Sequence, residues 1–97
     1  MRKNVLNFEE GWNKMISDLK EPKTFDTIGG RKKFTIRCTN GKIVFLSPYE
    51  GCTISKSEMR KVYQRFMEIK GWKTSDYTSI TVHASYFLRL LREYFVK

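Results

Sequence analysis

The sequence predicts an α+β domain: a three-stranded antiparallel meander packed with one helix that precedes it and two helices that follow it. The stretch 24–46 contains two dipeptides typical of hairpin turns, Gly29-Gly30 and Asn40-Gly41, each flanked by strand-forming residues. Before and after this stretch, apolar residues recur at helical spacing. These patterns give the order α-β-β-β-α-α, which the 97 residues accommodate as a single domain, residues 1–97.

The two turns also predict the register of the meander, residues 24–47, because a two-residue turn determines which residues face each other. Around the second turn we expect the opposing pairs Cys38–Ile43, Ile36–Phe45 and Phe34–Ser47. Around the first turn we expect Phe25–Phe34 and Asp26–Lys33. Side chains alternate between the two faces of a strand. Both turns therefore place the same apolar residues on one face: Phe25, Phe34, Ile36, Cys38, Ile43 and Phe45.

Residues 8–20 are predicted to form the first helix. Asn7 is a suitable N-cap, and Glu10 follows three residues later, as in a capping box. Pro22 ends the helix, because the residue before a proline is disfavoured in the helical region. We expect the apolar stripe of this helix to cover the sheet and complete the core; it consists of Phe8, Trp12, Met15, Ile16 and Leu19.

Two further helices are expected after a loop at residues 47–54, which contains Pro48 and Gly51. The first, residues 55–70, begins with the capping box Ser55-x-x-Glu58 and ends at Gly71. Its predicted buried stripe is Met59, Val62, Tyr63, Phe66 and Ile69. In the polar connection that follows, Trp72 and Tyr77 are expected to fold back onto the domain.

The last helix, residues 82–96 with Thr81 as its cap, is apolar on more than one side. Its core stripe is Ala84, Phe87, Leu88, Leu91 and Phe95, and it is widened by Tyr86, Leu90 and Tyr94. Either the helix is central in the domain, or part of it contacts another protein or a second copy, as in a homodimer. The two helices also permit a helix-turn-helix variant, although their connection is long for that motif.

The chain is strongly basic, with 19 Lys and Arg against 10 Asp and Glu and a net charge of +9. Residues 1–22 hold four charges of each sign, so residues 23–97 hold the whole excess, with 15 positive and six negative charges. A field of this size on a small domain favours polyanions, above all nucleic acid, with DNA the first choice. Phosphates are expected at the sheet turns and on the 55–70 helix. The predicted nucleic-acid-binding residues are Arg31, Lys32, Lys33, Thr35, Arg37, Lys42, Lys56, Arg60, Lys61, Gln64 and Arg65.

The second face of the sheet allows two interpretations. It carries polar and apolar side chains together: Asp26, Lys33, Thr35 and Arg37 with Ile28, Val44 and Leu46. A helix could cover the apolar residues while the charged side chains extend to solvent. Alternatively, the face is open and presents its cations to a groove or a phosphate backbone, as β-sheet readers of DNA do. The sequence favours the open face.

No catalytic or metal site is evident in the sequence. His83 is the only histidine, and neither cysteine has a neighbouring ligand at zinc spacing. Asp26 and Glu50 are isolated carboxylates, and Asp26 is better explained as the cross-strand partner of Lys33. We therefore expect a protein that is not an enzyme and that holds no metal or cofactor.

The location predicted from the sequence is cytoplasmic. No apolar run is long enough to span a membrane, and the start of the chain lacks the apolar segment of a signal peptide. Two cysteines, Cys38 and Cys52, are too few for a disulfide framework, so reduced thiols are expected.

The second half of the chain resembles small DNA-binding accessory domains found with HNH or restriction-type nucleases in bacterial and phage proteins. The similarity covers residues 24–92: a strand pair with a glycine turn, the capped basic helix SKSEMRKVYQRFMEI, and a tail of the form YTSITVHASYFLRLL. The resemblance implies that this segment helps to bind DNA while a separate domain cuts it. Because no nuclease domain is present in the sequence, two functions are expected. One is a nucleic-acid-binding module, and the other is a protein-binding regulator, such as a phage-encoded inhibitor of a host defence nucleoprotein complex.

Overall fold

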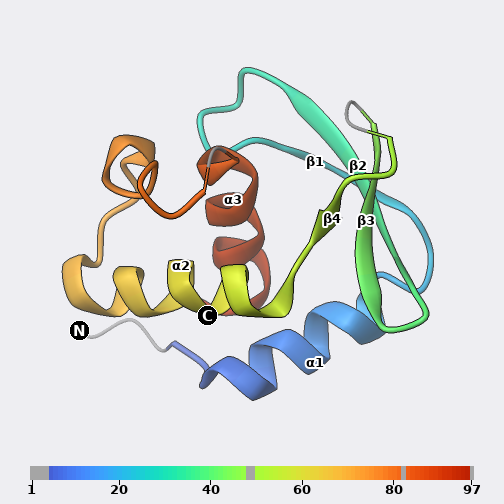
Figure 1. Ribbon diagram of the computed structural model, residues 1–97, viewed down its shortest axis with the longest axis horizontal. Coiled ribbons are helices and arrows are strands. Elements are labelled where there is room, and N and C mark those ends of the chain that lie inside the picture. The colour runs from blue at the N-terminus through green and yellow to red at the C-terminus, as the bar shows by residue number, and fades with distance from the viewer. Residues whose placement is uncertain (1–4, 48–49, 82, 97) are drawn as a thin grey trace.

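The computed structural model describes residues 5–47, 50–81 and 83–96. Within these residues the chain forms three α-helices, one 3₁₀ turn and a four-stranded antiparallel sheet in the order β1-β2-β3-β4 (Figure 1). This confirms the α+β class but corrects the predicted number of strands from three to four. The elements are α1 (Phe8–Asp18), β1 (Lys23–Asp26), β2 (Lys33–Thr39), β3 (Lys42–Ser47), β4 (Thr53–Ile54), α2 (Lys56–Ile69), η1 (Thr74–Asp76) and α3 (Ala84–Tyr94).

The hairpin of β2 and β3 turns at the predicted dipeptide. Asn40 and Gly41 both have positive φ, 51° and 74°, as a type I′ turn requires. Near the turn, the predicted register is confirmed in the pairs Cys38–Ile43 and Ile36–Phe45. Farther from the turn the register shifts, so that Thr35 faces Ser47 and the predicted pair Phe34–Ser47 is wrong. A bulge of this kind bends the strand, here where the chain leaves β3.

The connection between β1 and β2 is wider than the sequence predicted. The pairs Phe25–Phe34 and Asp26–Lys33 are present, but the strands stop there and residues 27–32 form a loop. The Gly30 N–H donates to the Thr27 carbonyl (2.7 Å), and only Gly30 of the Gly-Gly pair has positive φ, 73°. The tight turn is therefore at residues 27–30, one residue earlier than a two-residue turn at Gly29-Gly30.

The fourth strand comes from residues predicted as a loop. Thr53 and Ile54 pair with β3 opposite Val44 and Ile43. The Phe45 N–H donates to the carbonyl of residue 52 (2.7 Å), which holds the returning chain against β3. A two-residue strand is too short to show alternation in the sequence. Pro48, which helped to predict the loop, lies outside the described residues.

The first two helices begin at their predicted caps. The Asn7 side chain accepts from the Glu10 N–H (2.9 Å), and the Ser55 hydroxyl accepts from the Glu58 N–H (3.1 Å). α2 ends at Ile69, and its C-cap is Lys70 in the left-handed conformation (φ 52°), so the helix stops before the predicted Gly71.

At the C-terminal ends of α1 and α2, the structure differs from the predicted bounds and burial. α1 stops at Asp18, two residues before the predicted end. Ile69, predicted to be buried, is 37% exposed, because the last turn of α2 extends past α3 (Figure 1). After that turn, the fold-back of the connection is confirmed: Tyr77 is fully buried, and its hydroxyl donates to the Gly71 carbonyl (2.7 Å).

α3 is the central helix of the domain. Its predicted start, residue 82, lies outside the described residues, and the helix is observed from Ala84. The side chains that widen its apolar face are all buried: Tyr86 packs on Phe34, and Tyr94 packs on Phe25. The apolar width of α3 therefore serves the core of the same chain, and the surface that suggested a homodimer contact is covered.

The core lies between the helices and one face of the sheet, on which the apolar side chains Phe34, Ile36, Ile43 and Phe45 are buried. On the opposite face, Arg37 is exposed and Leu46 is 39% exposed. The second face is therefore open at Arg37 and Leu46, whereas Ile28 and Val44 are half-buried and Ile28 packs against the edge of the core. That its cations contact a phosphate backbone stays a prediction.

Candidate nucleic-acid interface

The predicted basic residues fall into two groups on different parts of the domain. The sheet group lies on the β1–β2 connection and the outer face of the sheet: Arg31, Lys32, Lys33, Thr35, Arg37 and Lys42. The α2 group lies on one helix: Lys56, Arg60, Lys61, Gln64 and Arg65. The electrostatic surroundings of the two groups differ.

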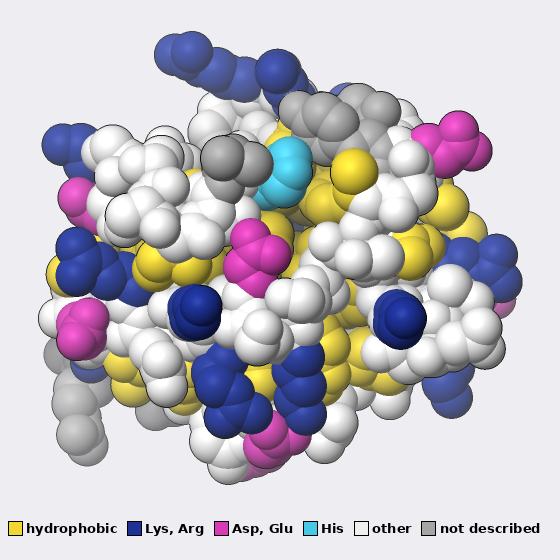
Figure 2. Space-filling model, in the orientation of Figure 1, with side chains coloured by type: hydrophobic (Ala, Val, Ile, Leu, Met, Phe, Trp, Pro, Cys, Tyr) yellow, Lys and Arg dark blue, Asp and Glu magenta, His cyan; other side chains and the backbone are white. Residues whose placement is uncertain are grey.

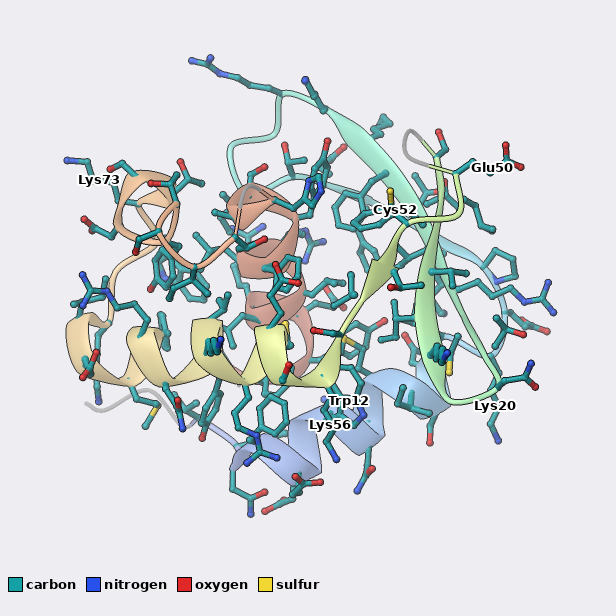
Figure 3. All side chains as sticks on the ribbon, in the orientation of Figure 1. Trp12, Lys20, Glu50, Cys52, Lys56 and Lys73 are labelled. Carbon is teal, nitrogen blue, oxygen red and sulfur yellow. The ribbon has the colours of Figure 1, made fainter. Side chains whose placement is uncertain are left out.

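The α2 group is partly neutralised by α1. Glu9 accepts from Lys56 Nζ at 3.0 Å and from Arg60 Nη2 at 2.9 Å. The hydrogen bond from Lys56, with a further contribution from Arg60, lowers the pKa of Glu9. Figure 3 shows Lys56 between α1 and α2, and Figure 2 shows acidic and basic side chains side by side along this edge. The positive charge of α2 is therefore offset by a carboxylate that lies far from it in the sequence, because packing brings Glu9 against Lys56 and Arg60.

Other members of the α2 group also have partners. The Arg60 guanidinium lies over the Phe8 ring, 4.6 Å from its centroid, which adds a cation–π contact to its ion pair. Arg65 approaches Glu68 (3.7 Å) and donates from Nε to the Asp76 carbonyl (3.3 Å). Among the described residues, Lys61 and Gln64 alone in this group are exposed without a side-chain partner.

The sheet group keeps more of its charge available. Lys33 is paired with Asp26 at 2.9 Å, as predicted, and the Thr35 hydroxyl is 2.8 Å from the Thr24 hydroxyl. Arg37 and Lys42 are exposed, and neither has a carboxylate partner in the described part of the chain.

Four unpaired cations of the described residues lie around a groove that the sequence did not predict. This basic groove, of about 770 Å³, is lined by the β1–β2 connection, residues 72–74 and one side of α3. Figure 1 shows the first two segments on either side of the start of α3. Four cations line it: Arg31, Lys32, Lys73 and Arg92. Within the described residues, none of the four is ion-paired, and no acidic side chain lines the groove.

Aromatic and hydroxyl groups complete the lining of the basic groove. The half-buried Trp72 lines it and packs on Phe66 with ring centroids 4.6 Å apart. Thr27, Thr74 and Ser85 contribute hydroxyl groups. The Ile28 N–H donates to the Ser85 carbonyl (3.2 Å), which ties the β1–β2 connection to α3.

Sequence reasoning found two of the four groove cations. Arg31 and Lys32 were predicted from the charge run after Gly30. Lys73 and Arg92 were missed, because one lies in a polar connection and the other on a helix assigned to the core. The neighbouring pair Trp72-Lys73, an aromatic beside a cation in a loop, is the signal that could have drawn attention to this segment.

The structure also brings one member of each predicted group together. Lys42 and Lys56 line a smaller hollow of about 410 Å³ beside Trp12. Because Lys56 is bonded to Glu9, this hollow carries less free charge than the basic groove.

The three residues considered for catalysis, Asp26, His83 and Glu50, lie on separate parts of the domain. Asp26 is ion-paired with Lys33, and the His83 ring packs near Phe45 and Tyr86 at the start of α3. Glu50 is exposed on the β3–β4 loop (Figure 3). In residues 5–47, 50–81 and 83–96 there is no cluster of three or more His, Cys, Asp or Glu side chains suited to a metal ion. Within those ranges, no helix combines the length and the apolar character that crossing a membrane requires.

Comparison with protein-family models, with curated proteins and with solved structures found no match to this chain. The resemblance to nuclease-associated accessory domains therefore stays a prediction.

Proposed function

We propose that this protein is a small nucleic-acid-binding module without catalytic activity of its own. The observation that carries the proposal is the basic groove, which four cations line and to which no acidic side chain of the described residues contributes. Arg37 and Lys42 on the open face of the sheet extend the positive surface beyond the groove. Cations that have no internal carboxylate partner are available to replace the counterions of a phosphate backbone.

The contribution proposed for α2 is smaller than the sequence suggested. A phosphate that approaches Lys56 or Arg60 has to compete with Glu9, which already accepts from both. Lys61 is the cation of this helix that is most accessible to a ligand. We therefore place the main phosphate contacts on the β1–β2 connection and the sheet, with α2 at the margin.

A salt titration tests the proposal. If roughly four to six phosphates are contacted, the logarithm of the DNA-binding constant falls with the logarithm of salt concentration at a slope of about −4 to −5. The double variant Arg31→Gln/Lys32→Gln is expected to make that slope less negative by about two. The matched control is Lys14→Gln/Lys20→Gln, which removes the same charge from exposed positions on and after α1.

Two results would contradict the proposal. One is binding that does not depend on salt, and the other is an equal loss of affinity in the variant and in the control. The protein-binding regulator makes the opposite prediction for purification from a host lysate: its partner stays bound after nuclease treatment, whereas a nucleic-acid binder loses the associated nucleic acid.

A further inference from the structure

The basic groove has the composition of a site for an unpaired strand. Sites that bind single strands combine a positively charged groove with an aromatic ring on which a base can stack. Here Arg31 and Lys32 lie on one wall, Lys73 and Arg92 line the groove from two other segments, and Trp72 is part of the same lining. In the smaller hollow beside Lys42 and Lys56, by contrast, the aromatic residue is Trp12, which is only 6% exposed.

The position of Trp72 is fixed before any ligand binds. Phe66, which is buried in α2, packs on the indole at 4.6 Å between centroids. The Tyr77 hydroxyl bonds the Gly71 carbonyl and so holds the chain just before the ring. A ring that is already ordered loses little conformational freedom when a base stacks on it.

The size of the groove separates single strands from duplexes. A volume of about 770 Å³ lies in the range of small-molecule sites, which hold one or a few planar groups. A duplex has a persistence length of about 50 nm and keeps its bases inside, so it cannot bend into a groove between a loop and a helix. A single strand can bend at each nucleotide and turn a base toward the wall. The hydroxyl groups of Thr27, Thr74 and Ser85 are then available to base edges.

We propose that the basic groove binds single-stranded nucleic acid, with its four cations contacting phosphates of the strand and one base stacked against Trp72. This inference rests on the proposed nucleic-acid-binding function and specifies both the site and the form of the ligand.

The two tryptophans of the chain provide a direct test. Trp12 is 6% exposed in the core, whereas Trp72 lines the groove. Titration with an oligothymidine strand is expected to quench the fluorescence of Trp72, with a midpoint that matches binding measured by anisotropy of the labelled strand. The variant Trp72→Phe, which retains an aromatic contact with Phe66, is expected to lose the quenching because Trp12 is shielded.

The charge variants locate the site independently of fluorescence. Lys73→Gln/Arg92→Gln is expected to make the salt slope for the single strand less negative by about 1.4, since each phosphate contact on a single strand contributes about 0.7. Lys20→Gln is the control at an exposed lysine, and Figure 3 shows Lys20 and Lys73 on opposite sides of the molecule. Because these side chains are exposed, the thermal unfolding midpoints of all three proteins should agree within a few degrees.

The outcomes distinguish this inference from the function on which it rests. Quenching, together with loss of affinity in Lys73→Gln/Arg92→Gln, supports the site. Salt-dependent binding that Lys73→Gln/Arg92→Gln leaves unchanged overturns the groove and leaves nucleic-acid binding in place. Tighter binding to a duplex of the same length overturns the preference for an unpaired strand. Failure to bind any nucleic acid overturns both.

Discussion

Gly11 offers a sharp test of how the two ends of the described chain meet. It lies within α1 and is buried against Phe95, which follows α3. A Cβ atom at Gly11 would lie 2.2 Å from Cδ2, 2.5 Å from Cε2 and 2.7 Å from Cγ of the Phe95 ring. The ring is fully buried and is flanked by Phe8 and Tyr63, with centroids 5.6 and 5.7 Å away, so it has no free space to enter.

The backbone around Phe95 is held as firmly as its ring. The Leu6 N–H donates to the Phe95 carbonyl (2.8 Å), and an isolated antiparallel bridge joins Val5 to Val96. Because both the ring and its backbone are constrained, the substitution Gly11→Ala requires a shift of α1 relative to the C-terminal segment.

The expected magnitude comes from two opposing effects. In a helix with free surroundings, alanine is more favourable than glycine by about 1 kcal/mol. Forcing an additional carbon into a packed core typically costs about 1–3 kcal/mol, occasionally more, and contacts this short place Gly11→Ala at the top of that range. We therefore expect a net loss of about 2 kcal/mol, which lowers the melting temperature of a domain of this size by roughly 10 °C.

Urea unfolding followed by far-ultraviolet circular dichroism measures this loss. Gly29→Ala serves as a control, because no atom lies within 4 Å of a Cβ placed there. The double variant Gly11→Ala/Phe95→Leu should lose less stability than the sum of the single changes, since the smaller side chain relieves the clash. A stabilised or unchanged Gly11→Ala protein would refute the packing of Phe95 against α1.

Three further predictions concern the β2–β3 turn, the partly buried hydrogen bond between Tyr94 and Asp18, and the charge of α2. Gly41→Ala should destabilise by about 1–2 kcal/mol in urea unfolding, because φ is 74° there while the space around it is open; a cost equal to that of Gly29→Ala would contradict this. Tyr94→Phe removes a 2.5 Å hydrogen bond to Asp18 and should cost about 1 kcal/mol at pH 7, at the low end for a charged acceptor because Asp18 is partly exposed. This bond is the largest cause that lowers the pKa of Asp18 below its usual 3.8, so its contribution is present above that pH and is lost as the pH falls through the lower folded value. The stability difference between Tyr94→Phe and the parent protein should accordingly narrow in acid, and a difference that is constant with pH would count against the assignment. Glu9→Gln releases two cations of α2 and should steepen the salt slope for DNA by about one if α2 contacts phosphate; an unchanged slope places the ligand elsewhere.

Elements that depend on short-range chemistry were predictable. The caps at Asn7 and Ser55 need only a side chain and an amide three residues away. The Asn40-Gly41 turn needs only two residues that tolerate positive φ. Gly29-Gly30 has similar chemistry, but the connection there is wider, because its backbone is tied to Ser85 on α3, a contact that local sequence does not encode.

In the candidate site, too, some features were predictable from the sequence and others depended on packing. A basic surface was predictable from composition, and Arg31 and Lys32 were identified because they follow a turn. Whether a given cation is available was not predictable, since that depends on carboxylates brought from elsewhere in the chain. Glu9 reaches Lys56 and Arg60 only because α1 packs beside α2.

By itself, then, the sequence determined the α+β class, the N-caps of the first two helices, one hairpin turn and the excess of positive charge, all of which follow from neighbouring residues or from composition. The predicted cap Thr81 of the last helix was wrong, because α3 begins after His83. Tertiary structure alone decided that α3 is central, that a two-residue strand is added at the edge of the sheet, and that Lys73, Arg92 and Trp72 line one groove with Arg31 and Lys32. The physical reason is the separation along the sequence over which each interaction acts. Propensity and capping act between residues a few positions apart, whereas a groove and its net charge exist only where segments far apart in the chain are packed together.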